Sequence, residues 1–184
     1  VMTYLAYKTT GFPKNRVIGM AGLLDGSRLI YLIASSLRCP RSSVETYILG
    51  SHGDTMVPLI SKTKVDGKPI TEIMEEGKLQ AIVKRTCDRG AEIVSLFGSG
   101  SAYYSPSAAV FKMIESILKD KKETLAASAY LEGEYALSDL CIGVPCKIGK
   151  NGIEEIVELD ISKEEKAALA RSAQAIKDLN KLLQ

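Results

Sequence analysis

The chain has 184 residues, of which 46% are hydrophobic and 25% charged, and its 24 basic and 22 acidic side chains leave a formal net charge of +2. This composition is ordinary for one globular domain with its own core. The charges are interspersed, which favours neither a nucleic-acid surface nor a trough for acidic substrates. No apolar run approaches the ~20 residues of a membrane span, and no signal peptide is recognisable, so no membrane partner is expected.

Four cysteines, Cys39, Cys87, Cys141 and Cys146, accompany a single histidine, His52. The cysteines form no C-x-x-C pair, and one histidine cannot complete a His/Cys cluster of the usual spacing, so we expect no metal site. Reduced cysteines suit a reducing compartment, which predicts a cytoplasmic protein. Cys141 and Cys146 fall in an apolar, strand-like stretch and are expected to be core residues rather than nucleophiles.

The period of the apolar residues changes along the chain, and it predicts an α+β domain with antiparallel strands and packed helices. Helical spacing comes first, as in the stripe of Leu29, Ile33 and Leu37, then strand-like alternation, then helices, three strands and a last helix. The expected elements are a helix at 1–10, an extended piece at 16–20, a helix at 22–37, strands at 44–49, 57–60, 61–65 and 68–70, helical segments from 71 to 97, a helix from 105 to 119, strands at 125–132, 140–148 and 152–159, and a helix from 162 onward.

Turn residues mark several of these boundaries. Asp66-Gly67 and Asn151-Gly152 each predict a tight hairpin, the second one inside an antiparallel meander of three strands. The helix at the N-terminus has no cap before it, so we expect the chain to be a piece of a longer polypeptide.

Helix-capping residues mark two further boundaries of the predicted elements. Ser105 before Pro106 is expected to cap the helix that follows. Ser162 and Glu165 form a capping box at the start of the last helix. That helix carries on one face Leu169, Ile176, Leu179 and Leu183.

The histidine lies in the pentapeptide Gly50-Ser51-His52-Gly53-Asp54, directly after the predicted strand at 44–49. Imidazole exchanges a proton near neutral pH without a large pKa shift, and loops at strand ends often present reactive groups. His52 is therefore a candidate acid–base residue. The alternative interpretation is a turn histidine that only hydrogen-bonds its neighbours.

Asp25 and Arg28 lie three residues apart in the first turns of the helix at 22–37, so both side chains leave the same face. If that face meets the His52 loop, the carboxylate can hold one ring nitrogen while the other exchanges a proton with substrate. The guanidinium can grip a substrate carboxylate through two hydrogen bonds. Spacing alone favours an ion pair on a solvated surface, worth ~0.3–0.5 kcal/mol.

Two motifs at this separation, Leu24-Asp25-Gly26-Ser27-Arg28-Leu29 and Leu49 to Leu59 around His52, resemble the catalytic half of the lactate/malate dehydrogenase family. The lead-in Thr10 to Gly19 and the later stretches at 98–104 and 130–135 resemble it too, so the likeness covers essentially the whole chain. The resemblance implies the C-terminal-domain fold of lactate dehydrogenase and an NAD-dependent 2-hydroxy acid dehydrogenase. It does not assign cofactor-binding residues within this chain.

Within that family, the matching residues imply three roles. His52 donates a proton to the keto oxygen during reduction and removes it during oxidation, and Asp25 orients His52 and raises its basicity. Arg28 binds the substrate carboxylate, while the nicotinamide carries the hydride. The family commonly has Ser-Ala where this chain has Gly26-Ser27, and glycine there costs up to ~1 kcal/mol relative to alanine without displacing the flanking side chains.

The substrate is expected to be a small dicarboxylate, because the chain is most similar to the lactate-dehydrogenase-like malate dehydrogenases. Met20-Ala21-Gly22 and Met56 resemble that branch. Gly100 stands about where lactate enzymes carry a threonine, and a small residue leaves room for the second carboxylate of oxaloacetate. L-lactate dehydrogenase is the alternative within the family.

No G-x-G-x-x-G fingerprint follows a predicted strand, so we expect residues 1–184 to be a substrate-binding and catalytic C-terminal domain without its N-terminal dinucleotide-binding domain. Such a chain alone should show no turnover, because the hydride donor has nowhere to bind. The family forms homo-oligomers, dimers or tetramers, which leaves a non-catalytic assembly fragment as an alternative. A serine hydrolase is the other one, although no G-x-S-x-G elbow is present.

Overall fold

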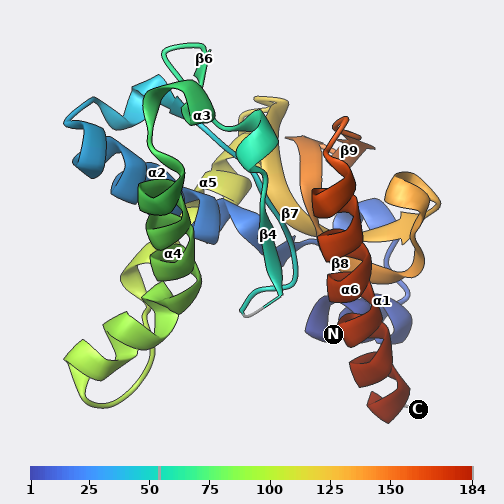
Figure 1. Ribbon diagram of the computed structural model, residues 1–184. Coiled ribbons are helices and arrows are strands. Elements are labelled where there is room, and N and C mark those ends of the chain that lie inside the picture. The colour runs from blue at the N-terminus through green and yellow to red at the C-terminus, as the bar shows by residue number, and fades with distance from the viewer. Residues whose placement is uncertain (54, 184) are drawn as a thin grey trace.

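The computed structural model describes residues 1–53 and 55–183 (Figure 1). Its elements alternate between groups of helices and groups of strands, which confirms the predicted α+β class. The helices are α1 (Met2–Thr10), α2 (Gly22–Leu37), α3 (Ile70–Ile73), α4 (Glu76–Phe97), α5 (Tyr104–Leu118) and α6 (Lys163–Asn180). The strands are β1 (Gly19–Met20), β2 (Val44–Glu45), β3 (Ile48–Gly50), β4 (Met56–Pro58), β5 (Lys64–Val65), β6 (Lys68–Pro69), β7 (Glu123–Glu132), β8 (Ser138–Gly149) and β9 (Gly152–Ile156).

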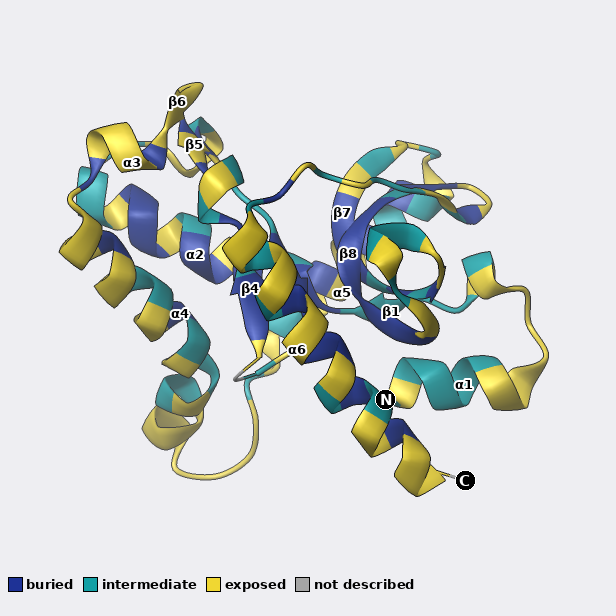
Figure 2. Ribbon diagram, turned by 45° about the vertical axis from the view of Figure 1, so that its right-hand side comes forward, coloured by how far each residue is buried: buried dark blue, intermediate teal, exposed yellow. Residues whose placement is uncertain are grey.

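A six-stranded antiparallel sheet forms the centre of the described chain, in the order β1-β7-β8-β3-β4 with β9 also paired to β8. The predicted meander is confirmed, since β7 pairs with β8 from Glu123↔Ile148 to Glu132↔Ser138 and β8 pairs with β9. Most of β7 and β8 is buried, as Figure 2 shows, because α5, α2 and α6 pack against this sheet. The sheet therefore supplies a rigid floor for the loops at its ends.

The predicted strand at 44–49 is in fact two strands in different sheets. Val44 and Glu45 pair with β5 in a small three-stranded sheet, whereas β3 pairs with β4 and β8 in the central one. The chain crosses over at Thr46 and Tyr47, where the Tyr47 carbonyl accepts a hydrogen bond from the amide of Leu59. The prediction was wrong because a local alternation of side chains does not say which sheet each half joins.

The predicted strand at 61–65 is also partly wrong. Residues Ile60–Lys62 form a 3-10 turn, and only Lys64–Val65 is strand. The turn at Asp66-Gly67 is confirmed between β5 and β6, with φ of 47° and 76° at its two residues. In the second hairpin the two turn residues are Lys150 and Asn151, one position earlier than predicted, because Gly149 pairs with Gly152.

Among the predicted caps, one is confirmed and one is wrong. The Ser162 side chain accepts a hydrogen bond from the amide of Glu165 at 3.2 Å, and the Glu165 carboxylate accepts one from the amide of Ser162 at 2.9 Å. The helix predicted from Ser105 instead begins at Tyr104, and no side chain caps it. Aromatic contact between Tyr103 and Tyr104, with ring centroids 4.6 Å apart, accompanies that earlier start.

The helices bury their apolar stripes unequally. Leu29 and Ile33 of α2 are fully buried, as predicted, in a core cluster shared with α4 and the small sheet. Leu169 and Ile176 of α6 join the core cluster over the central sheet. Leu179, predicted on the same face of α6, stays 51% exposed because that end of the helix runs past the sheet (Figure 2).

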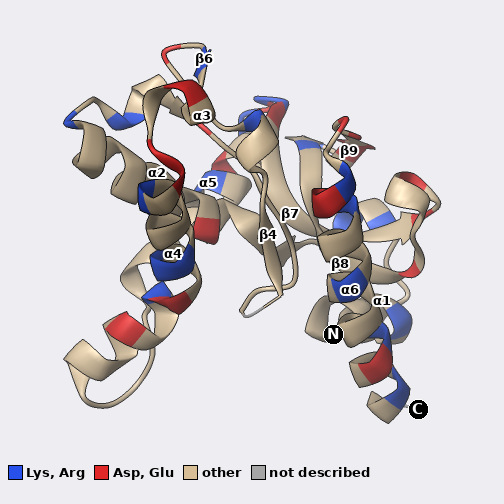
Figure 3. Ribbon diagram, in the orientation of Figure 1, with Lys and Arg blue, Asp and Glu red and all other residues tan. Residues whose placement is uncertain are grey.

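Charges of both signs alternate along α4 and α6, while the central strands are largely uncharged (Figure 3). In the part of the chain that the structure describes, no helix has the length and hydropathy required to cross a membrane.

Candidate active site

His52 and Asp25 meet at the end of the central sheet. The Nδ1 atom of His52 lies 2.7 Å from the Oδ2 atom of Asp25. Asp25 is 1% exposed, whereas the His52 side chain is 52% exposed. A carboxylate only accepts hydrogen bonds, so Nδ1 carries the proton and Nε2 is left to exchange one with a molecule outside.

Arg28 completes the group from one turn further along α2. Its Nη1 atom donates to the Oδ1 atom of Asp25 at 3.0 Å, so Asp25 accepts one hydrogen bond on each oxygen. Arg28 is only 8% exposed, and the ion pair on a solvated surface is therefore the wrong description of this pair. The Nε atom of Arg28 is buried and has no hydrogen-bond partner among the described residues. A buried donor without a partner costs ~1–3 kcal/mol, which an anion bound beside it would offset.

The close approach of α2 to β3 brings these residues together. A methyl group at Gly22 would lie 1.8 Å from the carbonyl oxygen of Ile48, so only glycine lets the first turn of α2 touch this strand. Asp25 follows three residues later on the same face, and β3 leads directly into His52. The helix N-terminus also carries a partial positive charge, which favours the buried carboxylate.

The hydrogen bond from His52 to Asp25 raises the pKa of the imidazole above its ordinary 6.5. Partial burial of the ring lowers the pKa, the negative charge of Asp25 raises it further, and the positive charge of Arg28 lowers it. The net direction is upward, so the carboxylate outweighs the desolvation of a ring that remains half exposed. The imidazole therefore keeps its proton to a higher pH than an unperturbed histidine does.

A cavity of about 520 Å³ lies beside His52. Met20 and Ala21 line it from the sheet side, and the first residues of α1 and the last turns of α6 close it. Its α6 wall includes Ala175, Ile176 and Leu179, none of which was predicted from the sequence to line a site. In the sequence, the one pattern that could have indicated these lining residues was the apolar stripe of α6, and burial in the core explained that stripe equally well.

The structure places the remaining predicted site positions apart from this group. Gly100 is exposed in the connection between α4 and α5 and has a φ of 88°, and it does not line the cavity. Gly26 is buried inside α2, and a methyl group added there would meet no atom within 4 Å. Asp54 of the histidine pentapeptide lies outside the described residues.

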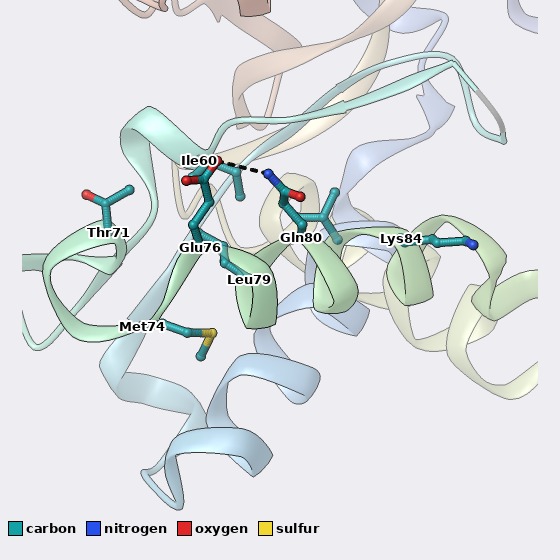
Figure 4. A pocket seen from close by; sticks show the side chains of 8 residues that line it. Ile60, Thr71, Met74, Glu76, Leu79, Gln80 and Lys84 are labelled. Atoms are coloured by element: carbon teal, nitrogen blue, oxygen red, sulfur yellow. Dashed lines mark hydrogen bonds between the residues drawn. The ribbon is translucent and has the colours of Figure 1, made fainter.

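Another hollow, of about 580 Å³, lies between the 3-10 turn at Ile60 and the first half of α4 (Figure 4). Its walls are mostly apolar, and Gln80 donates a hydrogen bond to Glu76 at 3.0 Å across its rim. Asp25, Arg28 and His52 do not line it, so it is separate from the candidate acid–base group.

Cys141 and Cys146 are buried core residues, as predicted. Burial raises the pKa of the Cys141 thiol to about 11 and that of the Cys146 thiol to about 12, so neither is a thiolate at neutral pH. Within residues 1–53 and 55–183, no group of three His, Cys, Asp or Glu side chains has the arrangement of a metal site.

Comparison with known proteins identifies the relatives of this fold. The sequence model described as lactate/malate dehydrogenase, alpha/beta C-terminal domain, matches residues 23–183. The malate dehydrogenase of Staphylococcus epidermidis is 48% identical over 183 residues, and the aligned region covers 100% of this chain and 58% of that protein. For the malate dehydrogenase of Anoxybacillus flavithermus the identity is 46%, and the shares are 100% and 59%.

Solved structures of malate and lactate dehydrogenases also superpose on this chain. The malate dehydrogenase of Salinibacter ruber superposes with a TM-score of 0.95 at 47% identity, over 99% of this chain and 60% of that one. The lactate dehydrogenase of Eimeria maxima, solved with NADH and oxamate, gives 0.96 at 38% identity, over 99% and 56%. This chain thus spans about three fifths of the length of these proteins. The protein belongs to the lactate/malate dehydrogenase family, and its residues correspond to the family's alpha/beta C-terminal domain.

Proposed function

We propose that this chain is the substrate-binding and catalytic domain of an NAD-dependent malate dehydrogenase, which interconverts malate and oxaloacetate, a step of the tricarboxylic acid cycle. The observation that carries the proposal is the buried group of Asp25 between His52 and Arg28. It combines a proton-exchanging nitrogen with a guanidinium whose buried Nε has no hydrogen-bond partner among the residues that the structure describes. A 2-hydroxy acid needs both features within a few ångströms of each other.

His52 is the proton donor and acceptor of the proposed reaction. In the protonated state, Nε2–H gives its proton to the keto oxygen as hydride reaches the carbon, and in the reverse direction Nε2 removes the proton of the hydroxyl. Asp25 accepts from Nδ1 throughout, which selects the tautomer with a free Nε2 and stabilises the imidazolium. Because Asp25 is almost fully buried, water does not compete for this hydrogen bond.

Arg28 is the anchor for the substrate carboxylate. One edge of its guanidinium is held by Asp25 through Nη1, which leaves Nε and Nη2 on the opposite edge. Two donors in one plane match the two oxygens of a carboxylate, and a lysine could not supply this geometry. Gly90 of α4 lies behind the guanidinium, where an added methyl group would be 3.8 Å from Nη1.

NAD supplies and accepts the hydride when it is bound. The cavity beside His52 is large enough for a planar heteroaromatic ring, since ligand sites commonly enclose ~300–1,000 Å³. Its small and apolar lining, from Ala21, Gly143 and Ile176, suits one face of such a ring. The rest of a dinucleotide needs a glycine-rich phosphate site, which residues 1–184 do not contain as a sequence motif. We therefore assign the binding of most of the cofactor to an N-terminal domain, and expect this chain alone to be inactive.

Malate is preferred to lactate as the substrate because the relatives named above at 46–48% identity are malate dehydrogenases. Gly100 is proposed to leave space for a second carboxylate, although it is exposed in the connection between α4 and α5 and does not line the cavity at His52. The lactate dehydrogenase neighbour keeps L-lactate as the alternative within the same mechanism.

We further infer that the whole protein is a cytoplasmic homo-oligomer, a dimer or tetramer. Support for self-association comes from α5, whose large apolar side chains remain on the surface of this chain, with Phe111 66% and Leu118 79% exposed. A patch of this kind usually marks an interface. A purely structural, assembly-only role for the chain is weakened by the hydrogen-bonded group of His52, Asp25 and Arg28, which assembly does not require.

Steady-state kinetics of the complete polypeptide would test the proposed reaction. His52→Asn should remove nearly all turnover with either oxaloacetate or pyruvate, because no other group supplies the proton. Arg28→Lys should mainly raise the KM for oxaloacetate, since the charge stays but the paired donors are lost. Arg85→Lys, which changes an exposed arginine paired with Glu92, is the matched control and should leave both constants unchanged.

Two results would overturn the proposal. Turnover of His52→Asn at the rate of the parent enzyme would exclude His52 as the proton donor. Efficient reduction of pyruvate with weak reduction of oxaloacetate would replace malate by lactate as the substrate.

A further inference from the structure

A buried hydroxyl group ties the loop of His52 to the last helix of the chain. The amide of Ser51 donates a hydrogen bond to the Oγ atom of Ser172 at 2.9 Å. The Ser172 hydroxyl in turn donates to the Oγ1 atom of Thr55 at 3.3 Å, and Thr55 is hydrogen-bonded to the hydroxyl of Ser51. Ser172 therefore contacts the loop on both sides of His52.

Ser172 is a rigid support for this loop. It is 0% exposed, and it lies on the buried face of α6 between Leu169 and Ile176, which both belong to the main core. The capping box at Ser162 fixes the start of the same helix. The position of the Ser172 hydroxyl is thus set by core packing and not by the loop.

The backbone at Gly50 also lies very close to the Ser172 hydroxyl. Gly50 has a φ of 87°, a conformation that favours glycine, and a methyl group on it would lie 2.8 Å from the Ser172 Oγ atom and 2.9 Å from the carbonyl oxygen of Thr55. The loop is therefore folded tightly around one hydroxyl. Its other glycine, Gly53, has a φ of 118°, which is also a conformation that favours glycine.

We propose that Ser172 is a positioning residue, which holds the His52 loop so that the imidazole meets Asp25 in the geometry needed for proton exchange. The importance of this role for catalysis rests on the proposed function, but the positioning itself is a property of the 184-residue chain. Among the described residues, Ser172 has no hydrogen bond to the imidazole or to Asp25, and it acts through the backbone of Ser51 and the side chain of Thr55.

Two restraints act on the His52 ring, its hydrogen bond to Asp25 and the position of its loop. The His52 side chain is half exposed, so packing does little to fix it, and among the described residues the hydrogen bond to Asp25 is its direct anchor. Without the Ser172 hydroxyl, the amide of Ser51 loses its acceptor and the loop gains freedom. The distance from Nδ1 to Asp25 then spreads to larger values, and the carboxylate raises the pKa of His52 less.

The chain itself offers a direct readout, because His52 is its only histidine. The imidazole protons give a single, unambiguous set of signals in a nuclear magnetic resonance titration. We expect Ser172→Ala to move the midpoint down toward the ordinary value of about 6.5. The amide of Ser51 should exchange with solvent roughly three- to tenfold faster, as loss of one hydrogen bond predicts.

Ser116→Ala is the matched control. Ser116 is also 0% exposed and also lies on a helix, α5, but its hydroxyl donates to the carbonyl of Ile148 at 2.7 Å and it does not line the cavity at His52. This variant should lower the melting temperature by an amount similar to Ser172→Ala while leaving the His52 titration unchanged. Thr55→Val, which keeps the shape of an exposed side chain but removes its hydroxyl, should shift the midpoint in the same direction as Ser172→Ala.

Two outcomes would overturn the proposal. One is a His52 titration in Ser172→Ala that matches the parent chain while the melting temperature falls, which would make Ser172 a packing residue only. The other is an equal shift in Ser116→Ala, which would trace the effect to general loosening of the core. Neither outcome depends on turnover, so the positioning role and the proposed dehydrogenase activity can fail independently of each other.

Discussion

The Nδ1 atom of His52 lies 2.7 Å from the Oδ2 atom of Asp25, and this bond joins a half-exposed ring to a carboxylate that is almost fully buried. The second oxygen of Asp25 holds Arg28. One buried carboxylate therefore organises both the proton-exchanging group and the proposed anion anchor. Protonation of His52, or substitution of His52 or Arg28, should therefore change the interactions of this one carboxylate.

The stability of the chain should decrease at this site as the pH rises through the neutral range. The folded pKa of His52 is raised above the unfolded value of about 6.5, so the contribution of the hydrogen-bonded imidazolium is complete below that value. It is lost as the pH rises through the folded pKa. Urea unfolding of the parent chain and of His52→Gln, followed from about pH 5 to about pH 9, measures it as the difference between the two curves. A difference that stays constant over that range would contradict the raised pKa.

Asp25→Asn should destabilise the chain strongly and lower the pKa of His52. The amide keeps the shape of the carboxylate but leaves Arg28 with an uncompensated buried charge, and breaking such a pair costs ~3–5 kcal/mol. Asp178→Asn, which breaks the exposed pair between Asp178 and Lys181, is the control and should change stability by less than ~1 kcal/mol. Equal losses in the two variants, measured by urea unfolding, would show that the Asp25 pair is not buried in solution.

Gly26→Ala should stabilise the chain. Position 26 is inside α2, its φ is not in the left-handed region, and an added methyl group meets no atom within 4 Å. Alanine in a helix interior is favoured over glycine by roughly 0.5–1 kcal/mol. The expected rise in melting temperature should leave the titration of His52 unchanged, because Asp25 and Arg28 keep their places. A destabilised Gly26→Ala variant would mean that the glycine has a packing role that the structure does not explain.

Cys141 and Cys146 should resist alkylation in the folded chain. Both thiols are buried, with pKa values raised to about 11 and about 12, and the thiolate is the reactive form. Cys39, which is only partly buried, is the internal reference and should react before both of them. Mass spectrometry of peptides after brief iodoacetamide treatment at neutral pH measures each site. Early labelling of Cys146 would place it outside the core of the sheet.

Several features of this protein were predictable from local patterns. The stripe of α2, the three-stranded meander and the capping box at Ser162 depend on residues close together in the chain, and all three are confirmed. The family resemblance is also confirmed, because it depends on two short motifs and their separation. Local periodicity misled where a segment changed partners, as between Glu45 and Ile48, which belong to different sheets.

Other features depended on contacts between distant parts of the chain. The residue types of Asp25, Arg28 and His52 indicated an acid–base group, but the spacing of Asp25 and Arg28 alone favoured a surface ion pair. Burial decided between the two, and burial follows from the contact of Gly22 with the carbonyl of Ile48, which no local pattern encodes. The support of the His52 loop by Ser172 crosses 121 positions between Ser51 and Ser172. Hydrogen bonds of this kind arise only when core packing brings a helix and a loop together, so periodicity along the chain carries no trace of them.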